Sequence, residues 1–147
     1  MLLEGPAVVS PTAAGTYMVG VPVWMWVRQG QTTWGPNSAS ASAGGITVRA
    51  TATVSRVVWS MGDGSSVTCT GPGTPYTASR GMADSPDCGH RFKATSAGGP
   101  GGRYQGTATS KWDIDWAVTG SGQTGQLTEV RQSAFTVAVG EIQVVGQ

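Results

Sequence analysis

Charged side chains are scarce in this chain of 147 residues: they make up 12% of it, whereas an average globular domain holds about 25%. Lys and Arg together number 9 and Asp and Glu number 8, so the formal net charge is +1. Binding to nucleic acid needs clustered Lys and Arg, and so does a polybasic membrane anchor. We therefore expect neither nucleic-acid binding nor electrostatic attachment to a membrane.

Long apolar runs are also missing. The longest, residues 19–27, is about half as long as a membrane-spanning helix must be, so the sequence predicts no transmembrane segment. The first residues carry no positive charge, and Glu4 interrupts their apolar side chains, which is not typical of a secretory signal. We expect either a chain trimmed from a secreted precursor or a protein exported together with another.

Helix-forming residues are few, with 3 Leu, 3 Glu and 2 Lys. The chain holds 17 Val and 18 Thr instead, whose branched side chains suit a pleated sheet. The 23 Gly and 8 Pro predict frequent turns. Six Trp and a hydrophobic share of 39% argue for a packed core rather than disorder. The composition therefore predicts an all-β fold.

Cysteine and histidine are too few for a zinc finger, which needs four such ligands at short spacings. The chain has only Cys69, Cys88 and His90. A disulfide between the two cysteines would close a 20-residue loop and contribute about 3 kcal/mol, mainly by restricting the unfolded chain. The alternative is a pair of buried thiols. A disulfide implies an oxidising, extracellular location, and we expect no metal and no cofactor.

The strand signals predict an antiparallel sandwich of two sheets with about seven or eight strands, and a closed barrel is the alternative. Residues 1–16 are expected to be an extended lead-in and 17–147 a single sandwich domain. The expected strands are 17–27, 46–61, 67–70, 91–95, 104–119, 127–133 and 135–145, and a break at Gly140 is an alternative for the last one.

Two further expectations concern the first half of the chain. Residues 29–45 are expected to form a loop, with a turn at 34–37 followed by alternating Ser and Ala. Residues 46–61 are long for one strand, so a bend or bulge is expected near 53–55. In the first segment one face holds Ile46, Val48, Ala50 and Ala52, and in the second one face holds Val57, Trp59 and Met61.

The run Val58-Trp59-Ser60-Met61-Gly62-Asp63-Gly64-Ser65, followed by His90-Arg91-Phe92 and a long strand from Tyr104, resembles PKD-type domains. These are immunoglobulin-like sandwiches of extracellular proteins. The resemblance implies that fold and setting, with spacer or adhesion roles more common than catalysis. The 20-residue disulfide loop and Met61, where an aromatic residue is usual, depart from the pattern. The segments Gly71–Tyr76 and Ser85–His90 also resemble small secreted proteins of high-GC actinobacteria.

His90 is the one imidazole available to a histidine-dependent hydrolase. In such an enzyme the imidazole would be oriented by Asp63, Asp84 or Asp87. The nucleophile would be Ser65, Ser66 or Ser85. A nucleophile elbow, G-x-S-x-G, is missing. We expect His90 to hydrogen-bond the structural turn formed by Gly62, Asp63 and Gly64, or the backbone beside the disulfide. The pair Asp113 and Asp115 is expected to be solvated rather than catalytic or calcium-binding.

The aromatic residues that bear on function divide into expected core residues and candidate ligand contacts. Trp59, Trp112 and Trp116 lie on apolar strand faces and are expected in the core. Trp34, in a Gly/Pro turn, and Tyr76, in the disulfide loop, are the best candidates for exposed ligand contacts, since sugar rings stack on flat aromatic faces. The alternative for Trp34 is to cap one end of the core.

These observations favour a non-catalytic extracellular structural or protein-interaction module of a secreted or cell-surface protein. Its partner would be another protein or a second copy, bound through sheet edges or loops. The alternatives are a module that binds cell-wall glycan through Trp34 and Tyr76 and, least favoured, a hydrolase that uses His90.

Overall fold

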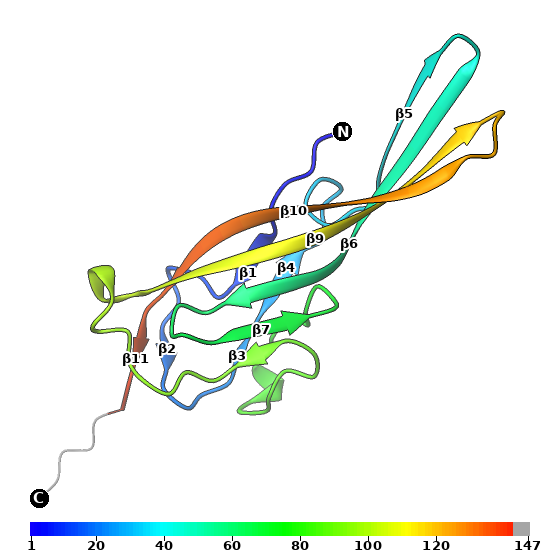
Figure 1. The fold of residues 1–147 in the computed structure, drawn as a ribbon. Helices are drawn as coiled ribbons and strands as arrows, with labels where there is room; N and C mark the ends of the chain where they lie inside the picture. The colour runs from blue at the N-terminus through cyan, green and yellow to red at the C-terminus, as the bar shows by residue number, and fades with distance from the viewer. Residues whose placement is uncertain (143–147) are drawn as a thin grey trace, which may run out of the picture.

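The computed structural model describes residues 1–142, and in them the chain forms eleven β-strands and two short 3-10 helices (Figure 1). In chain order the elements are β1 (Ala7–Ser10), β2 (Tyr17–Met18), β3 (Val23–Trp24), β4 (Trp26–Arg28), β5 (Asn37–Ala43), β6 (Ile46–Ser60), β7 (Ser66–Cys69), η1 (Ala78–Arg80), β8 (Gly89–His90), η2 (Pro100–Gly102), β9 (Tyr104–Thr119), β10 (Thr124–Val137) and β11 (Val139–Gly140). The expected all-β class is confirmed, but the strands number eleven rather than seven or eight. None of the helices in residues 1–142 has the length and apolarity needed to cross a membrane.

One antiparallel sheet dominates the structure. Its long strands follow the order β10-β9-β6-β5, and β7 pairs with the second half of β6. The pairing of β6 with β9 shifts register between Val54 and Arg56, which confirms the expected bulge. Because the bulge inserts one extra residue, the apolar face of the first half of β6 continues into Val57 and Trp59.

A second layer of three two-stranded ribbons, β1–β4, β3–β8 and β2–β11, packs against the second half of β6 and its neighbours. Val23, Met25 and Val27 from this layer share one buried cluster with Trp59 and Trp112 of the sheet. Both tryptophans are at most 1% exposed, as expected of core residues. The expected disulfide is present and joins the end of β7 to the residue before β8.

The expected strand 17–27 is interrupted, because the chain changes its pairing partner along it. Residue Trp24 pairs with Gly89 in β8, whereas Trp26 pairs with Ser10 in β1. Pro22, just before β3, has no N–H to donate to a continuous ladder. Within the stretch 1–16, β1 forms part of the second layer and Leu3 belongs to the core.

The last strands also differ from the expectation. The expected strands 127–133 and 135–145 are replaced by one long strand, β10, which pairs with β9 from Thr124 to Val137, and by the short β11. The segment 143–145 of the expected strand lies outside the described residues. No strand forms at residues 91–95; the short strand β8 ends just before them, at His90.

The expectation of a loop over residues 29–45 is wrong for residues 37–43, which form the strand β5. Small Ser and Ala residues have little strand preference of their own, but they alternate with period two, and the two-residue turn Gly44–Gly45 aligns them with β6. Both glycines have positive φ, +58° and +78°, as the two central residues of a type I′ hairpin turn require. Hydroxyl pairs such as Ser42 with Thr47, 2.7 Å apart, add cross-strand hydrogen bonds.

The four long strands extend beyond the second layer as two adjacent hairpins (Figure 1). We call this part, residues 37–52 and 114–127, the arm. Its register places Ala52 between Asn37 of β5 and Ile114 of β9, with Leu127 of β10 next to Ile114. The arm is therefore a four-stranded ribbon in which β5 and β10 are the edges.

Candidate functional site

A tight turn joins β6 to β7 and sets up a buried polar network. The N–H of Met61 donates to the carbonyl oxygen of Ser65 over 3.0 Å and closes the turn. Gly62 adopts a φ of +83°, and a Cβ there would lie 2.6 Å from the carbonyl oxygen of Gln105 in β9. Only glycine therefore allows the turn to lie this close to the sheet. The turn directs Asp63 toward β8.

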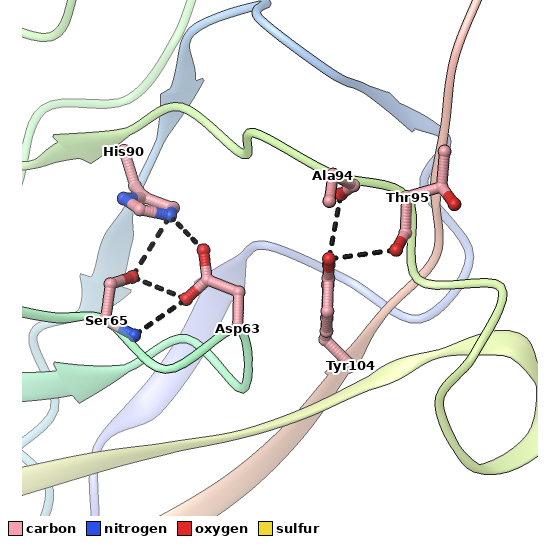
Figure 2. A network of polar contacts seen from close by, with 6 residues as sticks. All are labelled: Asp63, Ser65, His90, Ala94, Thr95 and Tyr104. Carbon is pink, nitrogen blue, oxygen red and sulfur yellow. Dashed lines mark hydrogen bonds and ion pairs between the residues drawn. The ribbon is translucent and has the colours of Figure 1, made fainter.

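Asp63 is held from two directions (Figure 2). The N–H of Ser65 donates to Asp63 Oδ1 over 3.0 Å, and the Ser65 hydroxyl donates to the same oxygen. From β8, Nε2 of His90 lies 2.8 Å from Asp63 Oδ2 and 3.3 Å from Ser65 Oγ. The side chains of His90 and Asp63 are only 14% and 15% exposed. The network thus connects the turn to the strand that follows the disulfide.

The carboxylate of Asp63 is stabilised in its charged form. Burial by itself raises the pKa of Asp63, but the hydrogen bonds from Ser65 and His90 together outweigh it, so the pKa lies below its ordinary value of 3.8. Asp63 is therefore ionised at neutral pH and remains an acceptor for all three donors.

An aromatic column extends the network to β9. The ring of His90 meets Phe92 edge-on at 4.8 Å, and Phe92 stacks on Tyr104 at 5.2 Å. The Tyr104 hydroxyl donates to the carbonyl oxygens of Ala94 and Thr95, 2.8 and 2.9 Å away (Figure 2). Burial, together with the charge of Asp63, raises the pKa of Tyr104. The column fixes the irregular segment after β8 onto the sheet.

The geometry of this network differs from that of a catalytic relay. In a Ser-His-Asp relay the serine and the aspartate contact different nitrogens of the imidazole. Here Asp63 and Ser65 both contact Nε2 of His90, and the Ser65 hydroxyl donates to the carboxylate of Asp63 rather than to the imidazole. This arrangement therefore lacks the geometry of a Ser-His-Asp relay and holds the turn against β8.

The four other aspartates have separate partners. Asp84 forms an ion pair with Arg91, and Asp87 accepts from Thr74 and Ser85. On β9, Asp113 lies 3.5 Å from Lys111, and Asp115 accepts a hydrogen bond from Gln126 over 2.8 Å. Within residues 1–142, no three His, Cys, Asp or Glu side chains gather in a way that could hold a metal ion.

The two aromatic residues singled out in the sequence occupy different environments. Trp34 is half-buried and packs against the core. Tyr76 is 42% exposed, and its ring meets Trp24 edge-on at 5.3 Å. Tyr76 and Trp24 line a hollow of about 360 Å³ with Trp26 and Met82. This cluster was not predicted, because the short helix η1 and its loop return Tyr76 and Met82 to β3 without a periodic pattern in the sequence.

An exposed apolar surface lies on the arm. We call it the apolar arm face; its residues, placed on one side by the strand register, are Ala39, Ala41, Ala43, Ile46, Val48, Ala50, Trp116, Val118 and Leu127. Ile46 is 53% exposed, Val48 39% and Leu127 58%. Trp116, expected in the core, is half-buried, because the second layer ends before it and its ring lies over Gly125 instead.

The N-terminal residues cross the base of this face. Leu3 is 9% exposed and belongs to the core cluster, and its carbonyl oxygen accepts from Nε of Arg131 in β10. The carbonyl oxygen of Leu2 accepts from Asn37 in β5, and that of Glu4 accepts from Nε1 of Trp112 in β9. Met1 and Leu3 line one hollow with Ala39, Ala41, Val48 and Ala50 of the arm, whereas Ile46 and Leu127 stay more than half exposed.

Comparison of the chain with protein-family models, with curated proteins and with solved structures found no match.

Proposed function

We propose that this chain is a non-catalytic module that works outside the cytoplasm and binds another protein through its arm. The disulfide between Cys69 and Cys88 supports the location, since such bonds persist in oxidising compartments. The polar network around His90 supports a structural rather than a hydrolytic role for that residue, because its hydrogen bonds hold a turn and lack the geometry of a Ser-His-Asp relay.

The apolar arm face is the observation that carries the proposal. Contiguous exposed apolar surface on a soluble domain marks a site of interaction. Val48 and Leu127 lie there with large exposed fractions. The face consists of Ala, Val, Ile, Leu and one Trp, so it has few donors or acceptors to hold a sugar, and its residues carry no cationic groups for an anionic membrane. An apolar protein surface is the occupant that matches this chemistry.

We also propose that the fold is a PKD-like, immunoglobulin-type sandwich of an extracellular protein. The placement of the residues that carry the resemblance supports this. Trp59 lies in the strand that leads into the Gly62–Gly64 turn, His90 hydrogen-bonds that turn, and Phe92 stacks on Tyr104. The long arm and the disulfide loop would then be additions to the common pattern.

The experiment compares matched substitutions on the two faces of the arm. Val48→Thr with Leu127→Thr keeps the strand-compatible shape of residue 48 and removes apolar surface from the apolar arm face. Arg49→Gln changes the opposite face. Cells that secrete each variant are treated with a chemical cross-linker before lysis, and the cross-linked products are identified by mass spectrometry. Melting temperatures of the purified variants show that each one folds.

The proposal predicts one discrete set of cross-linked proteins for the wild type and for Arg49→Gln, and its loss in the variant with both threonines. Melting temperatures should stay close to wild type, because exposed substitutions usually change stability by less than about 0.5 kcal/mol. Cross-links to other proteins that survive the loss of apolar surface would overturn the proposal. A hydrolytic activity that His90→Ala abolishes without lowering the melting temperature would also overturn it.

A glycan-binding module is the second candidate, and the cluster around Trp24 favours it. Tyr76 is exposed beside Trp24, and the guanidinium of Arg80 lies 5.7 Å from the centre of the Trp24 ring. Tyr76 thus offers an exposed aromatic surface to a sugar ring, and Ser10 and Thr16 line the same hollow with hydroxyl groups. Titration with soluble peptidoglycan fragments should shift the tryptophan fluorescence of the wild type but not of Tyr76→Ala. An unchanged wild-type spectrum would exclude this candidate.

A further inference from the structure

The outer edge of the arm presents unpaired backbone groups. The two-residue turn Gly44–Gly45 pairs Ala43 with Ile46, and in such a turn the carbonyl of the first residue accepts from the N–H of the second. Hydrogen-bonded pairs alternate along an antiparallel ladder, so Ala43, Ala41 and Ala39 bond to β6. The N–H of Val54, further along the same side of β6, donates to the carbonyl oxygen of Trp34, which agrees with this alternation. The N–H and C=O groups of the intervening serines of β5 therefore point away from the sheet.

These serines are Ser38, Ser40 and Ser42. Among residues 1–142, no strand pairs with this side of β5, which is exposed from Ser38 to Ala43. Natural proteins protect such edges with charges, prolines or bulges. The strand has none of these: it reads Asn-Ser-Ala-Ser-Ala-Ser-Ala, without charge or proline, and its register with β6 is regular.

Part of the opposite edge of the sheet is protected. Strand β10 carries Glu129 and Arg131, which form an ion pair. The N-terminal segment crosses beside it, with Gly5 so close that a Cβ would lie 2.6 Å from the carbonyl oxygen of Gln132. Strand β5, in contrast, has no such protection along its length.

The sequence of β5 matches itself in the antiparallel direction. Residues 38–42 read Ser-Ala-Ser-Ala-Ser in both directions, with Ser40 at the centre. When two copies pair about a two-fold axis at Ser40, Ser38 of one copy meets Ser42 of the other. Ala39 then meets Ala41, so that apolar residues stay on one face and hydroxyls on the other. The pairing brings no like charges together, because β5 has no charged side chain.

We propose that the arm also pairs with a second copy of this chain, joined edge to edge through β5 with a two-fold axis at Ser40. This inference goes beyond the proposed function, because the pairing uses the backbone of β5 and leaves the apolar arm face of each copy open to its own partner. Each serine of β5 donates one backbone hydrogen bond to the other copy and accepts one from it. The two four-stranded arms then form one continuous sheet. Because the axis is perpendicular to the sheet, the apolar arm faces of both copies lie on the same side.

The geometry gives a direct cross-linking test. Residues opposite each other in a hydrogen-bonded antiparallel pair have Cα atoms about 5.5 Å apart, within the range that a disulfide spans. Ser40→Cys should therefore form a disulfide-linked dimer when the purified protein is incubated with oxidised glutathione. Ser42→Cys alone should not, since its own copy in the partner lies about four residues away along the strand. A mixture of Ser38→Cys and Ser42→Cys chains should cross-link.

Thr128→Cys on β10 is the matched control, because Thr128 is equally exposed and faces the same side of the sheet as Ser40. The buried native disulfide is unaffected in every variant. Cross-linking at Thr128→Cys, or at Ser42→Cys alone, with a yield equal to that of Ser40→Cys would overturn the proposal. So would a failure of the Ser38→Cys and Ser42→Cys mixture to cross-link.

Sedimentation velocity measures the same dimer without a cross-link, from about 1 μM to about 1 mM, where even a millimolar affinity is detectable. Ser40→Pro removes a donor that β6 does not use, so the hairpin should remain while dimerisation weakens more than about tenfold. Ser40→Lys should act likewise, by placing two positive charges at the axis, and mixing it with Ser40→Glu should restore dimers.

The outcomes separate this inference from the proposed function. A wild type that associates and loses association with Val48→Thr, but not with Ser40→Pro or Ser40→Lys, would overturn the edge pairing and leave the arm as a protein-binding surface. A protein that stays monomeric at about 1 mM, yet shows partner cross-links in cells that depend on Val48, would do the same. A monomer without such cross-links would overturn both.

Discussion

Replacing both Cys69 and Cys88 by Ala tests how much the disulfide contributes to this fold. The bond joins residues 19 apart in sequence, so it closes a loop of about 20 residues and should contribute about 3 kcal/mol by restricting the unfolded chain. Both cysteines are 2% exposed. Their truncation to Ala also leaves small cavities, so the double variant should lose slightly more than the cross-link alone contributes.

The assay is equilibrium unfolding in urea for the wild type, the reduced wild type and the double variant. Reduction keeps the sulfur atoms in place, so the reduced protein isolates the cross-link from the cavities. At this chain length a loss of about 3 kcal/mol lowers the melting temperature by roughly 6–12 °C. A reduced wild type that loses less than about 1 kcal/mol would refute the reasoning, because the loop would then be ordered, or already restricted, without the bond.

Three further predictions follow from individual side chains. The pKa of Asp63 is lowered in the folded state, so its contribution to stability is present above pH 3.8 and is lost as the pH falls further. Asp63→Asn should therefore be less stable than the wild type at pH 7. Its urea midpoint should also fall less steeply below pH 3.8 than that of the wild type. An equally steep fall would contradict this. Gly62→Ala should cost more stability than Gly64→Ala. Both glycines have positive φ, but only Gly62 has a carbonyl oxygen 2.6 Å from the added Cβ. Equal losses in calorimetry would count against the close packing. Ser96→Ala should cost about 1–3 kcal/mol in urea unfolding, because the buried hydroxyl accepts from the N–H of Val139, and a smaller loss would mean that this N–H finds another partner.

The parts of the fold that the sequence predicts well are those with large side chains in a clear alternation. Strand β9 runs from Tyr104 to Thr119 as expected, since Trp112 and Ile114 alternate with polar residues along it. The bulge in β6 follows from a face that would otherwise change sides after Val54. In both cases burial of one sheet face determines the register.

The parts that the sequence predicts poorly depend on partners far along the chain. Strand β5 has only small side chains, so nothing in its own residues separates it from a loop until β6 lies beside it. The short strands β3 and β4 divide one apolar run because each half pairs with a different strand. Trp116 lies on an apolar face like Trp112, but no second layer covers it. The apolar arm face was therefore not predicted as a site.

Amide hydrogen exchange in β5, followed by NMR at low and high protein concentration, tests the central claim most directly. In the monomer, the amides of Ala39, Ala41 and Ala43 should be protected by their bonds to β6, whereas those of Ser38, Ser40 and Ser42 should exchange freely. Edge-to-edge pairing predicts that the serine amides become protected as the concentration rises, with no change at Thr128 on β10. Serine amides that exchange equally fast at every concentration would contradict the account.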